Sequence, residues 1–277
     1  MQKTVIEPKG KNGQYFKDLW RYRGLALNFA KRDIRVRYKQ TAIGIGWALI
    51  GPLINMLLMS FIFGNLAKLP ADGQAPYPIM VYSGLIAWNL FARSLTVGAS
   101  AFSTNADLMK KVYFPRLAAP LGQALAVLAD SLISFLILFL LFALTGYSPP
   151  MARLPLGPVA LLLPLLLGFF AGIFLAPWSV RRKDLNHALP FLLQMGQYLS
   201  PVVYSFALIS ANFSPRMALL YSLNPMTGSL NAFKWCLIGE LDFHLPSFII
   251  SLAWLTFLIP AGLYRFRKAE RNFVDLI

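Results

Sequence analysis

The stretch RDIRVRYKQT (Arg32–Thr41) holds four of the chain's 26 lysines and arginines, and the 26 residues that follow it, Ala42–Ala67, contain no charged side chain. A transmembrane helix needs about 20 largely apolar residues, so this run is long enough to cross a bilayer. A basic segment beside such a run has three explanations: an arm that binds nucleic acid, a helix on the membrane surface, or the cytoplasmic flank of a span.

The composition of the whole chain argues against nucleic acid. Of 277 residues, 57% are hydrophobic and 13% are charged, against about 25% charged residues in ordinary soluble domains. The net charge of +15 would suit nucleic acid only on a folded, soluble face, and here the basic residues lie between long apolar runs. The single cysteine, Cys236, excludes an internal disulfide framework, and the polar start predicts that no signal peptide is cleaved. The sequence therefore predicts an integral membrane protein.

Runs without charge predict an all-α fold of six transmembrane helices. A further apolar run, Met217–Phe233, is short and is broken by the turn signal Asn224-Pro225. We expect it to belong to a periplasmic re-entrant segment, residues 210–244, that is shielded by protein or lines a watery cavity. One transmembrane domain, residues 1–277, is expected, with spans at about 42–67, 77–104, 117–145, 154–180, 188–209 and 245–264.

Basic residues predict the orientation of these spans, because cytoplasmic flanks collect lysine and arginine. With six spans, one side of the membrane holds 21 of the 26 basic residues and the other side holds four, with Arg93 left inside a span. A seventh crossing would put the basic C-terminal tail on the side that is poor in charge. We therefore expect both termini in the cytoplasm, with residues 1–40 cytoplasmic and interfacial and residues 265–277 as a cytoplasmic tail.

An amphipathic helix is expected before the first span. Apolar residues that include Phe16 and Trp20 share one face of a helical wheel, and basic residues that include Arg32 and Arg35 share the opposite face. Such a helix lies in the headgroup plane, where each cation contributes about 1 kcal/mol with anionic lipids. The expected residues of the interfacial helix are Phe16, Trp20, Arg32, Arg35 and Arg37. The simpler interpretation, in which Lys31 to Lys39 only enforce topology, is compatible with this one.

Seven blocks of the sequence form a specific combination. They are RDIRVRYKQTAIGIGWALIGPL (Arg32–Leu53), YPIMVYSGLIAWNLF (Tyr77–Phe91), NADLMKKVYFPRLAAPL (Asn105–Leu121), RRKDLNHALPFLLQ (Arg181–Gln194), YLSPVVYS (Tyr198–Ser205), LNPMTGSLNAFKW (Leu223–Trp235) and FRKAERNFVDLI (Phe266–Ile277). In this order, over nearly the whole chain, they resemble the polysaccharide-export permeases of the type-2 ABC exporters, the group that moves O-antigen, capsule or teichoic-acid chains. Arg93 and the residues around Arg181 depart from the typical pattern.

The resemblance implies a fold and an assembly. It implies six spans, an N-terminal interfacial helix, and re-entrant outer helices before the last span. It also implies a homodimer that forms a channel, with two copies of a separate nucleotide-binding ATPase subunit beneath it. Six helices from one chain are too few to enclose a pore for a glycan, which also favours a homodimer.

The inner loop between the second and third spans is the expected contact with the ATPase. Its pattern favours a short helix capped by Asn105, with Asp107 in the first turn and Pro115 at the end. The resemblance implies that it is the coupling helix; the alternative is a basic loop that only sets topology. The loop that follows Arg181 is a second, weaker candidate. The expected coupling residues are Asn105, Asp107, Leu108, Lys110, Lys111, Arg181, Arg182 and Asp184.

Aromatic residues suit a path for sugars, because rings with polar tips contact apolar C–H faces and hydroxyl edges without fixed ionic sites. They also serve as interface anchors or as packing. An ionisable residue inside a span costs about 2.5–3.5 kcal/mol. Arg93 and Asp130 are therefore expected to pair or to snorkel, or Arg93 contacts a pyrophosphate linkage of the substrate. The candidate path residues are Tyr82, Trp88, Phe91, Arg93, Phe102, Tyr198 and Tyr204.

Motifs for catalysis and nucleotide binding are not recognisable in the sequence. The phosphate cradle G-x-x-x-x-G-K-[ST] is absent, so no cofactor is expected on this chain, and ATP with Mg²⁺ is expected on the partner subunit. His187 and His244 belong to no Ser/His/Asp set or metal spacing. Glu240, Asp242 and His244 are more simply interpreted as a solvated loop than as a metal site, so neither an enzyme nor a metal centre is expected.

These observations predict the channel-forming subunit of an ATP-driven exporter in a bacterial inner membrane. Its cargo would be lipid-linked polysaccharide moved from cytoplasm to periplasm, as lipopolysaccharide biosynthesis requires. An exporter of teichoic acid, drugs or lipids is the alternative within the same fold. A glycan-processing enzyme would need catalytic carboxylates or a metal, and a non-transporting scaffold would tolerate loss of residues 105–116.

Overall fold

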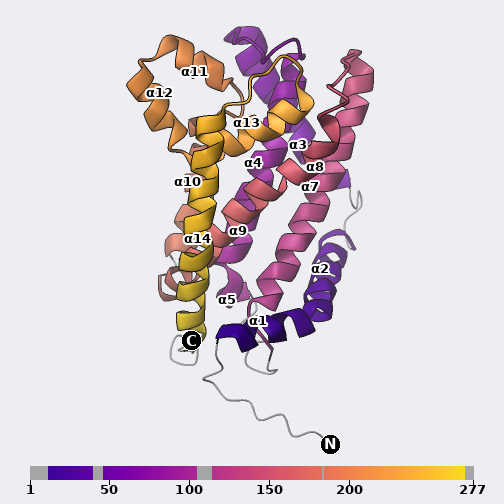
Figure 1. The fold of residues 1–277 in the computed structure, drawn as a ribbon. Helices are drawn as coiled ribbons and strands as arrows, with labels where there is room; N and C mark the ends of the chain where they lie inside the picture. Colours follow the sequence, from indigo (N-terminus) through magenta and orange to yellow (C-terminus); the bar gives the residue numbers. More distant parts are fainter. Residues whose placement is uncertain (1–11, 40–45, 105–113, 183, 272–277) are drawn as a thin grey trace, which may run out of the picture.

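Helices are the regular elements of the computed structural model, which describes residues 12–39, 46–104, 114–182 and 184–271 (Figure 1). No β-strand occurs among these residues. The elements are α1 (Asn12–Arg21), α2 (Arg23–Tyr38), α3 (Gly46–Met59), the π-helix η1 (Ser60–Leu66), α4 (Tyr77–Ala99), α5 (Ala101–Thr104), α7 (Ala118–Thr145), the 3-10 helix η2 (Leu154–Leu156), α8 (Gly157–Ala160), α9 (Leu162–Arg181), α10 (Asp184–Leu199), α11 (Phe206–Asn212), α12 (Pro215–Ser222), α13 (Pro225–Leu237) and α14 (Leu245–Arg271).

Three described helical segments are long and apolar enough to cross a membrane: Ala118–Thr145, Leu154–Arg181 and Leu245–Glu270. A shorter apolar helix covers Ile50–Leu66. α4 is less apolar, but most of its residues are buried by neighbouring helices, so its polar side chains need not face lipid. The predicted all-α fold is confirmed, and helices occupy each of the six ranges in which spans are expected.

The fifth expected range, 188–209, differs most from the structure. α10 ends at Leu199, and a new helix, α11, begins only at Phe206. Pro201 lies in the break, where a proline has no N–H to continue the helix and its ring clashes with the preceding turn. Ser205 then caps α11, because its hydroxyl oxygen accepts a hydrogen bond from the Ala207 N–H at 3.0 Å. The irregular segment expected at residues 210–244 therefore begins before residue 210.

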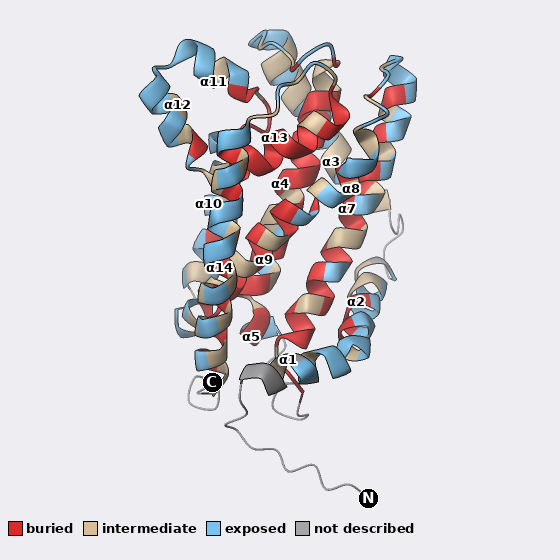
Figure 2. Cartoon of the chain, in the orientation of Figure 1, coloured by how far each residue is buried: buried red, intermediate tan, exposed pale blue. Residues whose placement is uncertain are grey.

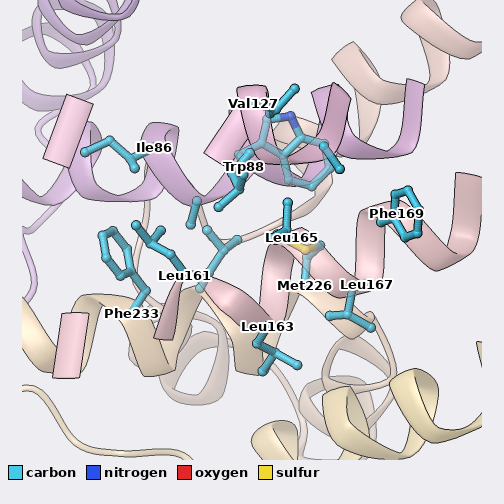
Figure 3. Packing of buried hydrophobic residues seen from close by; sticks show 14 of the residues in the cluster. Ile86, Trp88, Val127, Leu161, Leu163, Leu165, Leu167, Phe169, Met226 and Phe233 are labelled. Carbon is cyan, nitrogen blue, oxygen red and sulfur yellow. The ribbon is translucent and has the colours of Figure 1, made fainter. Parts of the chain in front are cut away.

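The hydrophobic core is built around α4, which packs against α9, α7 and α13. Ile86 and Trp88 of α4, Leu161 and Leu165 at the start of α9, and Phe233 of α13 belong to one cluster (Figure 3). Figure 2 shows the buried residues concentrated on α4, α9 and α13, whereas α10, α12 and much of α14 are exposed. The core is thus one-sided, because α10, α12 and one face of α14 are left exposed in the single chain.

Glycines allow α4 and α9 to approach closely. A Cβ atom added at Gly98 would lie 2.7 Å from the Phe169 carbonyl oxygen and 2.8 Å from the Ile173 nitrogen. Gly172 of α9 lies in the same way against the Leu95 carbonyl oxygen of α4. Small residues at helix crossings let backbones touch in a membrane, where lipid gives no hydrophobic drive for helices to associate. The α4–α9 pair is therefore a closely packed frame at the centre of the fold.

The two ends of the molecule carry different elements. α1, α2 and the C-terminal end of α14 lie at one end, and α11, α12 and α13 lie toward the other (Figure 1). Asn224 caps α13, since its side-chain oxygen accepts from the Met226 N–H at 2.9 Å, and Pro225 follows in the first turn. The helix break that the dipeptide Asn224-Pro225 predicts is confirmed.

Candidate functional site

The aromatic residues expected along a sugar path divide into buried and accessible groups. Tyr82, Trp88 and Phe102 are at most 4% exposed in the single chain, so their rings pack its core. Phe91 is half-buried, and its ring centroid lies 5.3 Å from that of Trp88. Tyr198 is 43% exposed. The accessible part of the set is therefore at the C-terminal end of α10.

Tyr198 and Tyr204 are joined at that end of α10. The Tyr204 hydroxyl donates to the Tyr198 carbonyl oxygen at 2.9 Å and lies 2.8 Å from the Tyr221 hydroxyl of α12. The phenol rings of Tyr204 and Tyr221, with centroids 6.4 Å apart, thus lie beside each other near the end of the helix. Such a surface offers both the stacking faces and the hydrogen-bonding edges that sugars use.

α10 makes few contacts with the rest of its own chain. Leu189 is its one buried residue, and Gly196 lets the helix lie against Trp88, since a Cβ there would be 3.0 Å from that ring. Gln194 is exposed, and polar side chains within a membrane usually face a watery cavity or a protein partner. The exposed apolar residues of α10 are Phe191, Leu192, Met195 and Leu199. This helix therefore presents a mixed surface that lipid alone does not suit.

Arg93 and Asp130 pair with each other. Arg93 Nη2 lies 2.8 Å from Asp130 Oδ2, and Asp130 is 3% exposed. The same carboxylate oxygen contacts Arg37 of α2, whose other contact is Asp33, 2.8 Å away and one turn earlier. Two carboxylates and two guanidinium groups thus balance in charge and join α2, α4 and α7. Of the roles left open for Arg93, pairing is the one that the structure shows.

A second ion pair, with both side chains buried, lies toward the end of the molecule that carries α11, α12 and α13. Lys234 of α13 is 3% exposed and lies 3.6 Å from Asp72 Oδ2, which precedes α4. Its Nζ also donates to the Pro201 carbonyl oxygen at 2.8 Å and the Tyr204 carbonyl oxygen at 3.4 Å. Lys234 therefore ties α13 to the break after α10 and to the loop before α4. Sequence reasoning missed this pair, although Lys234 is a lone charge in the apolar run 217–238.

The residues expected to meet an ATPase lie in two segments. Arg181, Arg182 and Asp184 are exposed where α9 passes into α10. Asn105, Asp107, Leu108, Lys110 and Lys111 lie outside the described residues. The part of their loop that is described, from Phe114 onward, packs into the protein: the rings of Phe114 and of Phe29 on α2 are 5.7 Å apart.

The N-terminal helix pair rests on α7 with only part of its expected apolar face. Ala26, Phe29 and Ala30 are buried, whereas Trp20 is 70% exposed and Leu27 is 51% exposed. Gly122 of α7 makes room for this contact, because a Cβ there would lie 2.6 Å from that of Phe29. Trp20 and Leu27 are left facing away from the protein, which fits a helix that lies in the headgroup plane.

The basic residues of the interfacial helix take different positions. Arg32 lies over the Phe29 ring at 5.0 Å from its centroid, and Arg35 is exposed. Arg37 turns inward to Asp130, so its guanidinium group pairs with a carboxylate of the protein, although it was expected among the interfacial residues. The Phe16 side chain lies outside the described part of the structure.

Metal chemistry has no visible centre in the described part of the chain, where no group of three or more His, Cys, Asp or Glu side chains is placed to hold an ion. His244 instead packs beside Phe206, with ring centroids 4.3 Å apart, and its Nδ1 lies 2.6 Å from the Ser247 hydroxyl oxygen.

A comparison with protein families covers most of the chain. Residues 27–238 match the family described as ABC-2 type transporter, a range that runs from α2 to the end of α13. The chain belongs to the ABC-2 type transporter family. Both buried ion pairs and the exposed helix α10 of this ABC-2 chain lie within the matched range.

Curated relatives of this ABC-2 chain carry a more specific name. It is 27% identical over 218 residues to the O-antigen export system permease protein RfbA of Myxococcus xanthus, covering 79% of this chain and 82% of that protein. It is 24% identical over 255 residues to a protein of the same name from Klebsiella pneumoniae, covering 91% of this chain and 95% of that protein. The family resemblance stated from the sequence is confirmed.

Proposed function

We propose that this chain is the transmembrane, channel-forming subunit of an ATP-driven exporter that moves lipid-linked polysaccharide, a glycan of the O-antigen kind, from cytoplasm to periplasm. The observation that carries the proposal is the likeness, over 91% of the chain, to a relative named as an O-antigen export permease. The all-helical fold and the match to the ABC-2 type transporter family support it.

Six membrane crossings with both termini in the cytoplasm form part of the proposal. Helices at all six expected ranges support that number. The start of α1 and the end of α14 lie at the same end of the molecule (Figure 1), which fits an even number of crossings. The strongly basic side of the chain would then face the cytoplasm of the inner membrane.

A homodimer follows from the exposure of α10. Within one chain this helix has a nearly unpartnered apolar surface and an exposed amide at Gln194. A second copy placed across α10 would cover the apolar side chains and leave polar groups beside a shared path. Tyr198 and Tyr204 lie at the outer end of that helix, where we propose that sugars pass them.

Energy would come from two copies of a partner ATPase at the cytoplasmic end. The residues proposed to meet it are Asn105, Asp107, Leu108, Lys110 and Lys111, together with the exposed Arg181, Arg182 and Asp184. ATP and Mg²⁺ would bind to the partner, because this chain has no phosphate cradle. The chain's own work would be to open and line the path.

Deletion of the gene tests this function. We expect loss of the surface polymer and accumulation of its lipid-linked form inside the cell, because synthesis continues when export stops. Surface glycans and intracellular lipid-linked glycans are extracted in parallel, with the restored gene as control. An unchanged surface together with altered sensitivity to drugs or lipids would overturn the polysaccharide assignment and favour another cargo.

A further inference from the structure

The cytoplasmic end of α14 contacts the chain on both sides of the proposed coupling segment, Asn105–Arg116. On the N-terminal side, Phe102 of α5 stacks on Phe266, with ring centroids 4.5 Å apart and an angle of 14° between the planes. Both rings are fully buried. The last helix is therefore packed against the chain just before that segment begins.

On the C-terminal side, Arg116 is bonded to the same turn of α14. Its backbone N–H donates to Glu270 Oε1 at 3.1 Å, and its Nη1 donates to the Glu270 backbone carbonyl oxygen at 2.6 Å. Residues four apart on a helix share one face, so Phe266 and Glu270 contact Phe102 and Arg116 from the same face of α14. One turn of one helix thus holds two points that are 14 residues apart in sequence, Phe102 and Arg116.

Tyr15 of α1 completes the cluster around Glu270. Its hydroxyl is buried close to the Glu270 carboxylate, whose charge acts on it, and the guanidinium group of Arg267 lies 4.6 Å from its ring centroid. Burial, and next the negative charge of Glu270, raise the pKa of the Tyr15 hydroxyl above its ordinary value. The Tyr15 hydroxyl therefore keeps its proton beside this carboxylate, and α1 belongs to the same cluster.

The Glu270 carboxylate can hold a neighbouring segment in place through hydrogen bonds, which an apolar side chain could not do. Hydrogen bonds to a charged acceptor are roughly twice as strong as neutral ones, and this acceptor takes the backbone N–H of Arg116. A connecting segment is ordinarily the mobile part of a structure. Here Arg116, at the exit of the segment, is fixed to α14 by its hydrogen bonds to Glu270.

We propose that Glu270 is a positioning residue for energy coupling, which fixes Arg116, at the exit of the proposed coupling segment, to α14 so that Arg116 and the last helix move together. This inference rests on the proposed function, in which the ATPase pushes on that segment. A displacement at the ATPase contact then reaches α14 through Glu270 and Phe266, and reaches α1 through Tyr15.

The test measures export and ATP hydrolysis in the same preparation. Inverted membrane vesicles that contain the full complex with its ATPase are given ATP, and lipid-linked glycan that becomes protected from an added glycosidase is counted per ATP hydrolysed. For Glu270→Ala we expect this ratio to fall about tenfold, the size typical of a residue that links two sites. The ATPase subunit should still co-purify with the chain and hydrolyse ATP.

Two variants serve as controls. Lys268→Ala alters an exposed charge on the same turn and should leave the ratio unchanged. Glu270→Gln keeps an oxygen acceptor for the Arg116 N–H and should recover part of the ratio. If Glu270→Ala lowers the amount of complex, Glu270→Gln is compared with the unchanged chain at equal amounts, where a lowered ratio is still expected.

The outcomes separate this inference from the proposed function. An unchanged ratio in Glu270→Ala, or export and hydrolysis that fall in the same proportion, would overturn the positioning role, because a simple brace lowers both together. Failure of the unchanged complex to protect any glycan would instead overturn the polysaccharide function itself.

Discussion

Replacing Lys234 by methionine is expected to destabilise the protein by about 3–5 kcal/mol, because removal of one member of a buried ion pair leaves the other charge uncompensated. Asp72, 4% exposed, would lose its cationic partner, and the Pro201 and Tyr204 carbonyl oxygens would lose their donor. Thermal unfolding of the detergent-purified chain should move to clearly lower temperature, and less of it should accumulate in the membrane.

Matched variants make this result specific to the pair. Lys68→Met removes another lysine near the outer end, but an exposed one, and should unfold like the unchanged chain. Adding Asp72→Asn to Lys234→Met removes the carboxyl group that has lost its partner, so the double variant should recover a large part of the lost stability. If Lys234→Met and Lys68→Met unfold alike, the buried pair does not hold the outer elements together.

Replacing Asp130 by asparagine is expected to cost about 1.5–3 kcal/mol, the range for a hydrogen bond to a charged group. Two guanidinium groups, those of Arg93 and Arg37, lose their shared carboxylate. Their side chains are 43% and 30% exposed, so solvent screens part of the effect, and the cost stays below that of the Lys234 change. Thermal unfolding of the purified chain measures it.

A double-variant cycle separates pairing from substrate contact at Arg93. If the pair is the main role, Asp130→Asn combined with Arg93→Gln should lose less stability than the sum of the two single changes. Arg93→Gln alone should then lower stability and export together. An Arg93→Gln chain that inserts and unfolds normally, yet exports nothing, would show that Arg93 serves the substrate instead.

Much of the helical layout follows from local sequence. Charge-free runs place the helices because a bilayer demands about 20 apolar residues per crossing, and Asn224-Pro225 marks the start of α13 because the two residues cap and begin it. The end of α10 was harder to place. The charge-free run continues past Pro201, so hydropathy alone extends the helix, and only the proline shows where it stops.

The contacts that join distant segments were beyond the sequence. Periodicity tells which face a residue occupies, but it does not name the partner on another helix. Lys234 and Asp72 both count as ordinary outer charges until the fold brings them together. Arg37 appears on a helical wheel as one cation among several, yet it reaches Asp130 on α7. Pairing of Arg93 with Asp130 was foreseen as one option only because two charges inside spans need partners.

In the candidate site, too, residue types could be predicted from the sequence, whereas their burial depends on the fold. The exposed positions of Arg181, Arg182 and Asp184 fit the contact proposed for them, while the role itself stays a prediction. Among the aromatic residues, composition suggested a path but burial distinguishes them: Tyr82 lies in the core and Tyr198 is accessible. Exposure depends on which helices face outward, and α10, which carries Tyr198, is one of them.

The most direct measurement of the central claim follows the glycan itself across the membrane. Inverted vesicles from cells that carry the chain and its ATPase are loaded with lipid-linked polysaccharide on their outer, cytoplasmic face, and glycosidase is added before and after ATP. We predict that ATP makes the polymer resistant to the enzyme, and that vesicles lacking this chain show no such change. Polymer that stays fully digestible in the presence of ATP and the intact complex would contradict polysaccharide export by this protein.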